Sequence, residues 1–286
     1  MTTHALETQQ GQRFEFGKNW LRFLQVLNEE RIVEAEKSLC AMLESASLAG
    51  KSFLDVGSGS GLFSLAAMRL GAAKVHSFDY DPQSVACTLE LKRRYFPAAE
   101  RWTIEAGSVL DAAFLARLGQ FDIVYSWGVL HHTGNMRQAL ENVAPLVAVG
   151  GKLFIAIYNN QGAASRRWKA VKIIYNQGGA WRLLVCAVFI PYFIIRGLGG
   201  DLLRMRNPFS RYRDYKKSRG MSLVYDWFDW LGGYPFEVAK AEEIFDYYRG
   251  KGFTLVKLKT CAGSPGNNEF VLQKGAEGAA PPVQFC

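Results

Sequence analysis

The stretch that most constrains the fold is residues 51–61, which reads KSFLDVGSGSG. Its apolar first half predicts a short buried strand, and the apolar spacing of residues 62–70 predicts a helix. Between them three glycines alternate with serines, and glycine tolerates both the positive φ of a tight turn and close approach of a ligand. A strand, a glycine-rich turn and a helix make up the unit in which a nucleotide lies against the backbone, near free N–H groups at the helix start.

The glycine spacing separates two classes of nucleotide cofactor. A dinucleotide fingerprint requires a third small residue where this chain has Leu62, which argues against a dehydrogenase. The pattern is D-x-G-x-G-x-G instead, and it resembles motif I of the class I S-adenosylmethionine (SAM) methyltransferases. That resemblance implies that the glycines flank the methionine part of SAM and that the acidic residue helps to hold its amino group. The predicted contacts are Asp55, Gly57, Ser58, Gly59 and Gly61.

A second predicted strand, residues 73–78, leads to Asp79 and Tyr80. Asp79 lies 22 residues after Gly57, close to the ~20 expected of a carboxylate that binds both ribose hydroxyls. The following Asp81 and Pro82 already have the form of a helix cap, which leaves Asp79 available for binding. Tyr80 is placed to pack on the adenine.

Two further strand ends complete the expected cofactor site. After a strand at residues 102–105, the family commonly has an aspartate that contacts the adenine amino group, and this chain has Ser108 there. Either Ser108 and the backbone of Val109 recognise adenine, or Asp111 does so by a different path. A fourth strand, residues 121–126, ends in Ser126 and Trp127, which we also expect beside the cofactor.

The order of these landmarks predicts the fold class. The middle of the chain resembles the middle of class I methyltransferases. It has, in order, a fourth strand, the segment VLHH, a helix at about residues 136–147, two glycines and an apolar strand at residues 152–158. We expect an α/β protein: a Rossmann-like seven-stranded methyltransferase sheet with helices on both faces and a helical insertion after strand five. A helix at residues 235–249 and a hairpin of residues 252–259 and 268–273 would complete it. The expected parts are an N-terminal helical cap (1–50), the SAM-binding core (51–158), the insertion (159–233), the C-terminal part of the core (234–274) and a flexible tail (275–286).

The insertion carries the basic character of the chain. Residues 161–220 hold thirteen Lys or Arg and two Asp, a local charge of +11, so the rest sums to −3 against a total of +8. An unbroken apolar run at residues 183–195 is shorter than the ~20 residues that span a bilayer. It is either a buried lid helix or an interfacial segment with basic flanks. The aromatic residues 14–20 either pack on the domain edge or cap the cofactor pocket, and residues 1–12 are expected to be frayed.

Five unpaired cysteines and no recognisable signal peptide favour a reducing cytoplasm, with the chain at the inner face of a membrane if the insertion binds one. Methyl transfer from SAM to a hydroxyl requires a base near the acceptor. His131 and His132 follow strand four and are the expected catalytic residues, with Asp226, Asp229 and Glu237 as lesser candidates. No metal is expected: in the loosely similar ubiquinone-biosynthesis O-methyltransferases this loop has two glutamates and a histidine, and here it has Gly128, His131 and His132.

The sequence leaves several functions open. The favoured hypothesis is SAM-dependent O-methylation of a small or lipid-like acceptor near a membrane surface. A tRNA or rRNA methyltransferase that uses the basic insertion is the alternative, although the N/D-P-P-Y/F motif expected after strand four is replaced by SWGV. A third hypothesis is a non-catalytic protein on the same scaffold. The sequence does not define the oligomeric state.

Overall fold

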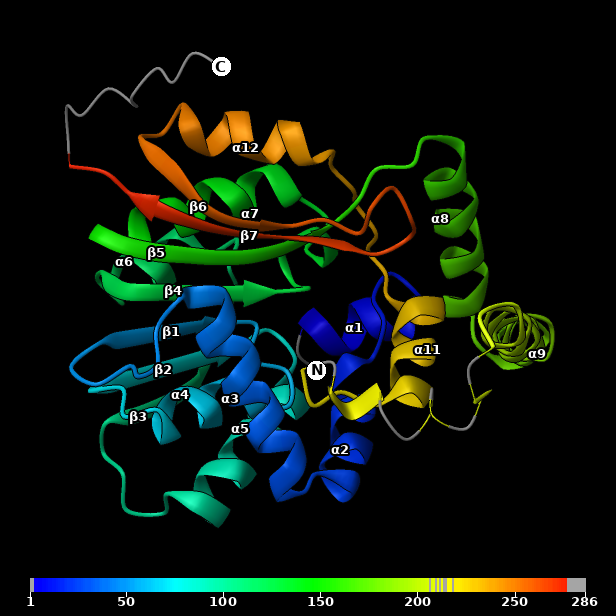
Figure 1. The fold of residues 1–286 in the computed structure, drawn as a ribbon, viewed down its shortest axis with the longest axis horizontal. Helices are drawn as coiled ribbons and strands as arrows, with labels where there is room; N and C mark the ends of the chain where they lie inside the picture. The colour runs from blue at the N-terminus through cyan, green and yellow to red at the C-terminus, as the bar shows by residue number, and fades with distance from the viewer. Residues whose placement is uncertain are drawn as a thin grey trace.

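The computed structural model describes residues 3–205, 207, 208, 210, 212, 215–217 and 219–276. Its centre is one seven-stranded sheet in the order β3-β2-β1-β4-β5-β7-β6 (Figure 1). β7 pairs antiparallel with both β5 and β6, and the other neighbours are parallel. The sheet, its closing hairpin and the α/β class confirm the predicted fold. The strands are β1 (Ser52–Val56), β2 (Lys74–Asp79), β3 (Trp102–Ala106), β4 (Phe121–Trp127), β5 (Val147–Tyr158), β6 (Phe253–Lys259) and β7 (Asn267–Lys274).

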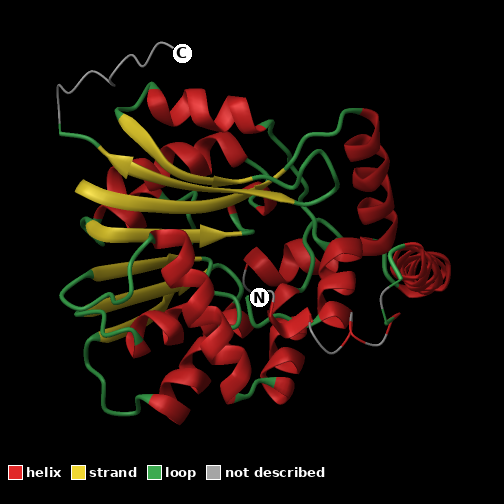
Figure 2. Ribbon diagram, in the orientation of Figure 1, coloured by secondary structure: helices red, strands yellow, loops and turns green. Residues whose placement is uncertain are grey.

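Helices cover both faces of the sheet (Figure 2). Alternate residues of β1 serve the two sides: Phe53 packs in the core with α3, α4 and α5, and Leu54 packs in the core with α6, α7 and α12. Both strand residues are fully buried, as expected for a central parallel strand. The helices are α3 (Glu29–Leu43), α4 (Leu62–Arg69), α5 (Pro82–Tyr95), α6 (Ala112–Ala116), α7 (Met136–Val143) and α12 (Ala241–Arg249).

The N-terminal residues are ordered, contrary to the expectation of a frayed start. They form α1 (Thr3–Gln9) and lead into α2 (Phe16–Val26). Glu7 accepts a hydrogen bond from Arg13 Nε at 2.7 Å and one from the Tyr80 hydroxyl at 3.3 Å. The polar composition did not reveal these contacts: Glu7 bonds to Arg13 and Tyr80, although no residue of α1 is fully buried.

The insertion folds as helices beyond the carboxyl ends of the strands, beside α1 and α2 (Figure 1). It comprises α8 (Ala163–Asn176), α9 (Gly179–Leu203), the short 3₁₀ turn η3 (Tyr215–Lys217) and α11 (Leu223–Gly232). The expected 13-residue apolar run is only the middle of the 25-residue α9, which continues through Pro191. By length and composition alone α9 could cross a membrane, which corrects the argument that the run is too short, although one such helix is weak evidence of a span.

Three other predicted elements differ in extent. The helix expected at residues 235–249 begins only at Ala241, because the backbone before it pairs with the core: Glu237 N donates to His131 O and Ala239 N donates to Tyr158 O, each at 3.0 Å. The helix expected to reach residue 147 gives way to the 3₁₀ turn η2 (Ala144–Leu146), and β5 starts five residues earlier than predicted. The predicted flexible tail lies outside the described residues from position 277 onward.

Candidate active site

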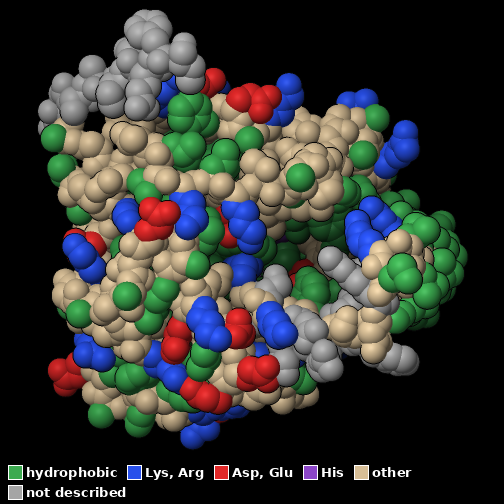
Figure 3. Space-filling view, in the orientation of Figure 1, with side chains coloured by type: hydrophobic (Ala, Val, Ile, Leu, Met, Phe, Trp, Pro, Cys, Tyr) green, Lys and Arg blue, Asp and Glu red, His purple; other side chains and the backbone are tan. Residues whose placement is uncertain are grey.

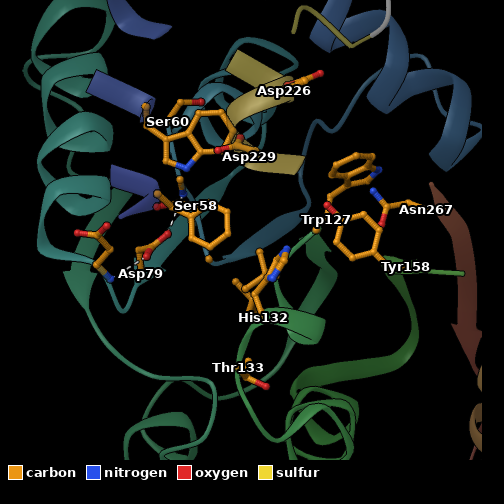
Figure 4. Close-up of a pocket in the computed structure, with 18 of the residues that line it drawn as sticks. Ser58, Ser60, Asp79, Trp127, His132, Thr133, Tyr158, Asp226, Asp229 and Asn267 are labelled. Carbon is orange, nitrogen blue, oxygen red and sulfur yellow. Dashed lines mark hydrogen bonds between the residues drawn. The ribbon is translucent and has the colours of Figure 1, made fainter. Parts of the chain in front are cut away.

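A pocket of about 630 Å³ lies at the carboxyl ends of β1, β2 and β4, where the sheet meets the insertion. Figure 4 shows Ser58, Ser60 and Asp79 on one side, Trp127, Tyr158 and Asn267 on the other, and His132 between them. Of the residues predicted from sequence, those lining the pocket are Asp55, Gly57, Ser58, Gly59, Asp79, Tyr80, Ser108, Val109, Trp127 and His132.

The glycine-rich turn packs too closely against its neighbours to accept side chains at Gly57 and Gly59. Gly57 and Gly59 have φ angles of +76° and +55°, in the left-handed region that favours glycine. A Cβ on Gly57 would lie 2.4 Å from Val129 Cγ1, and one on Gly59 would lie 2.9 Å from Trp20 Nε1. The turn is fixed from below, since the N–H groups of Gly57 and Ser58 both donate to Phe78 O.

Asp79 is held against this turn. Its Oδ2 accepts from Gly59 N and its Oδ1 accepts from Asp81 N, both at 2.9 Å. Burial raises the pKa of Asp79 to about 6. Asp81 caps α5 through Gln83 N, as predicted, and also accepts from Gly17 N at 2.7 Å. Asp79 is thus free of a capping role, and its carboxylate lies at the pocket wall.

Asp55 ends a buried chain of hydrogen bonds. Because an indole N–H can only donate, Trp102 Nε1 donates to Ser77 Oγ, Ser77 donates to Ser64 Oγ, and Ser64 donates to Asp55 Oδ2. These three bonds measure 2.9, 2.7 and 2.5 Å. Burial raises the pKa of Asp55 to about 7, and the Ser64 hydrogen bond only partly opposes that rise.

Several predicted residues lie away from the pocket lining. Gly61 has φ +80° at the start of α4 and faces Thr88 of α5. Ser126 is fully buried and donates to Val56 O at 3.1 Å. Asp111 caps α6 through Phe114 N, which removes the alternative adenine contact. None of these three residues lines the pocket.

The two histidines differ in position. His131 is fully buried outside the lining, with its ring 4.1 Å from that of Tyr158, so a catalytic role does not fit its position. His132 lines the pocket, and its Nδ1 lies 2.6 Å from Pro235 O, which places the proton on Nδ1. Burial, with a smaller effect of the Lys172 charge, lowers the pKa of His132 to about 3. This histidine is a weak base in the free protein.

The insertion supplies two carboxylates to the pocket from one face of α11 (Figure 4). Asp226 accepts from the Tyr215 hydroxyl at 2.6 Å, and Asp229 accepts from Asn19 Nδ2 at 2.8 Å. Burial raises the pKa of Asp226 to about 6 and that of Asp229 well above its ordinary value. Glu237, the third lesser candidate, instead caps α7 through Met136 N.

Sequence reasoning missed a large part of the lining. The sequence does not indicate that Arg219 or the β6–β7 turn reaches this pocket. By contrast, the spacing of Asp226 and Asp229 in an aromatic helix did indicate that both carboxylates belong to the site. Among the residues that the structure describes, no group of three or more His, Cys, Asp or Glu could hold a metal ion. The missed lining residues include His4, Glu7, Arg13, Trp168, Phe193, Arg196, Tyr215, Arg219 and Asn267.

Comparison with known proteins agrees with this geometry. The family described as "Methyltransferase domain" matches residues 54–153, which hold the glycine-rich turn, Asp79 and the ends of β3 and β4. This match, over residues 54–153, supports a class I SAM-dependent methyltransferase. The likeness of the chain to the ubiquinone-biosynthesis branch is only loose.

The curated relatives are similar over limited stretches. The ribosomal protein L11 methyltransferase of Methylococcus capsulatus is 52% identical over 52 residues, 18% of each chain. That of Photobacterium profundum is 34% identical over 123 residues, 42% of this chain and 38% of its own length. The chain therefore spans well under half of these relatives. The fold is also similar to that of a solved structure, magnesium protoporphyrin IX methyltransferase from Synechocystis PCC 6803 with bound SAH. The match has 12% identity and a TM-score of 0.50, and it covers 86% of this chain and 84% of the other. At this identity it supports the fold alone.

The cofactor of this domain is SAM, and the pocket fits it. The glycine-rich turn lines the pocket, and the Asp79 carboxylate lies beside it. Trp127 Nε1 and Asn267 Oδ1 are buried pocket atoms without a hydrogen-bond partner. When bound, SAM supplies a methyl group on a positively charged sulfur, so the protein must position the acceptor and exclude water.

Proposed function

We propose that this protein is a methyltransferase that uses SAM to O-methylate a small or lipid-like amphipathic acceptor at an anionic membrane surface. The place we propose is the cytoplasm, with the protein bound peripherally to the inner face of a membrane. One observation carries the proposal: the same helix, α9, contributes both a wall of the pocket and a long exposed apolar surface. An acceptor lying along that surface would reach the pocket without crossing water.

The two sides of α9 have different surroundings. Its inner side packs Val185, Phe189 and Phe193 against Trp168 of α8, and Phe193 and Arg196 line the pocket. Its outer side is apolar and dominates one end of the molecule (Figure 3). Arginines flank and interrupt this surface, which suits anionic headgroups. The exposed apolar residues of α9 are Trp181, Leu183, Leu184, Val188, Tyr192, Ile195, Leu198, Leu202 and Leu203.

The acceptor half of the pocket suits a hydroxyl that must lose a proton. Trp168, Phe193, Trp227 and Trp230 give it apolar walls that exclude water. Because burial raises the pKa of Asp226 to about 6, this carboxylate is closer to the pKa that suits base catalysis near neutral pH than an exposed aspartate is. Asp226 and Asp229 are therefore our candidates to accept the proton, ahead of His132.

Protein methylation is the second candidate, favoured by the names of the ribosomal protein L11 methyltransferases. Their similarity to this chain covers less than half of its length, so it leaves much of the acceptor half unaccounted for. Nucleic acid remains the third candidate because of the basic insertion, although Asp226 and Asp229 would repel phosphates inside the pocket.

Vesicle flotation combined with labelled SAM tests the proposal. We expect the protein to float with anionic vesicles and less with neutral ones, and label to enter the organic extract of membranes. Ile195→Glu on α9 should abolish flotation, whereas Leu89→Glu on α5, which also replaces an exposed aliphatic side chain, should not. Label in ribosomal protein or RNA, with no flotation, would refute the lipid-like acceptor and leave the SAM cofactor intact.

A further inference from the structure

Arg219 is a buried cation at the pocket wall that forms no ion pair with a described carboxylate, although its charge opposes the rise in the pKa of Asp226. Its side chain lines the pocket and is only 8% exposed. Nη2 donates to the Tyr125 hydroxyl at 2.8 Å, while Nε has no hydrogen-bond partner. Within the described part of the chain, no carboxylate comes within 4 Å of this guanidinium.

Aromatic rings hold the guanidinium in place. Arg219 Cζ lies 3.3 Å from the ring centroid of Trp127 and 4.7 Å from that of Phe63. Stacking on aromatic faces suits a guanidinium, but it does not replace the hydration that burial removes. A buried charge without a counter-ion is costly, so this position is explained best if an anion completes it.

The backbone around Arg219 is built to present this side chain. Arg219 itself has φ +58°, a left-handed conformation that is uncommon for a residue with a side chain. Arg31 of α3 donates to the carbonyl oxygens of Gly220, at 2.9 Å, and Met221. A Cβ on Gly220 would lie 2.3 Å from Arg31 O, so this glycine allows the loop to lie against α3. The loop is thus anchored immediately after Arg219.

We propose that Arg219 binds the α-carboxylate of the cofactor's methionine moiety, an inference that rests on the proposed SAM-dependent function. Phe63 lies in the first turn of α4, which follows the glycine-rich turn, and Trp127 lies at the end of β4, which pairs with β1. The guanidinium therefore contacts residues on two elements next to the glycine-rich turn. The other arginines of the lining fit this role less well. Arg13 is bonded to Glu7 and to His132 O, and Arg196 is exposed at the rim.

This assignment gives the insertion a part in cofactor binding. Arg219 lies outside the segment matched by the methyltransferase family, which ends at residue 153. Cofactor binding would then stabilise the positions of Arg219 and Met221, which precede α11 in the pocket wall.

Ligand truncation tests the role directly, without measuring activity. The binding of S-adenosylhomocysteine (SAH) is compared with that of 5′-methylthioadenosine, which lacks the amino-acid end, by calorimetry. For Arg219→Gln we expect SAH affinity to fall about 10- to 100-fold, the range for hydrogen bonds to charged groups. The affinity for 5′-methylthioadenosine should stay within about twofold, which also shows that the pocket remains folded. Arg219→Lys should lose less SAH affinity than Arg219→Gln, because lysine keeps the positive charge.

Arg182→Gln is the matched control. Arg182 belongs to the same insertion, stacks 5.0 Å from the Tyr175 ring and also has an Nε without a partner, yet it lies outside this pocket. Its substitution should leave the affinities for both ligands unchanged. Unchanged SAH affinity in Arg219→Gln would overturn the assignment and point to an anion on the acceptor; equal losses for both ligands would also overturn it. Failure of the wild type to bind SAH would instead refute the proposed function.

Discussion

Replacing Asp55 by Asn should stabilise the free protein while weakening cofactor binding. Asp55 is 2% exposed, and burial raises its pKa from the ordinary 3.8 to about 7. Between these two pH values the folded state binds a proton that the unfolded state has lost, so stability falls as pH rises through this window. Each pH unit of the window costs about 1.4 kcal/mol, so the ionised side chain lowers the free energy of unfolding by about 4 kcal/mol at pH 8 relative to strongly acidic pH.

Asparagine keeps the shape and the acceptor. Its amide oxygen can accept from the Ser64 hydroxyl as Asp55 Oδ2 does, so the chain from Trp102 through Ser77 survives. The substitution removes the ionisation and replaces the other carboxylate oxygen by an amide NH2 group. We therefore expect Asp55→Asn to raise the free energy of unfolding, and to raise it about 3 kcal/mol more at pH 8 than at pH 5.

Urea denaturation of the ligand-free protein at the two pH values measures this difference. Asp122→Asn is the control, because the Ser52 backbone N–H and hydroxyl lower the pKa of Asp122, and that carboxylate is ionised at both pH values. Its substitution should destabilise the fold to a similar extent at pH 5 and pH 8. If Asp55→Asn had the same effect at both pH values, or destabilised the protein at pH 8, the assigned burial cost would be wrong. SAH affinity should fall in Asp55→Asn, since the amide cannot pair with the ammonium group.

Two further predictions concern the backbone conformation at Gly61 and the role of His132 as a base. Gly61 has φ +80°, and Gly61→Ala would place a Cβ 2.8 Å from the backbone Cα of Thr88. We expect this substitution to lower the free energy of unfolding by about 2–4 kcal/mol. Gly119→Ala is the control, because Gly119 has a similar φ of +76° but no atom within 4 Å of the added Cβ, and it should cost about 1 kcal/mol. Similar losses in urea denaturation would contradict the steric argument. His132→Gln should leave the shape of the pH–rate profile between pH 5 and 9 unchanged, because the pKa of His132 is about 3. If the wild-type profile had an inflection near pH 6.5 that disappeared in His132→Gln, His132 would be the catalytic base.

The cofactor half of the site could be predicted from sequence because its residues follow strand ends. In a parallel sheet the carboxyl ends of neighbouring strands meet at one edge, so Asp55, Asp79, Ser108 and Trp127 converge although 72 residues separate the first and last. The exceptions have a local cause. Ser126 points to the opposite face from Trp127, as alternate strand residues do, and it bonds to the neighbouring strand.

The acceptor half could not be predicted, because its position depends on contacts between distant segments. Asn19 of α2 donates both to Asp229 and to the backbone of Tyr225, so α2 sets the orientation of α11. The polar start of the chain did not indicate that α1 would cover the pocket. Glu7 of α1 bonds to Arg13 and to Tyr80, and Tyr80 comes close only because it follows β2 in the folded sheet.

Contacts between α8 and α11 fix the acceptor half of the pocket independently of the glycine-rich turn. Lys172 of α8 is fully buried among the rings of Trp230, Phe236 and Tyr158, and it donates to Trp230 O at the end of α11. Asn176, one turn later, donates to Gly232 O. Two polar side chains of α8 thus fix the helix that carries Asp226 and Asp229. Substitutions in α8 would therefore shift both carboxylates together and alter the acceptor half, while the glycine-rich turn, bonded to Phe78 O, keeps its geometry.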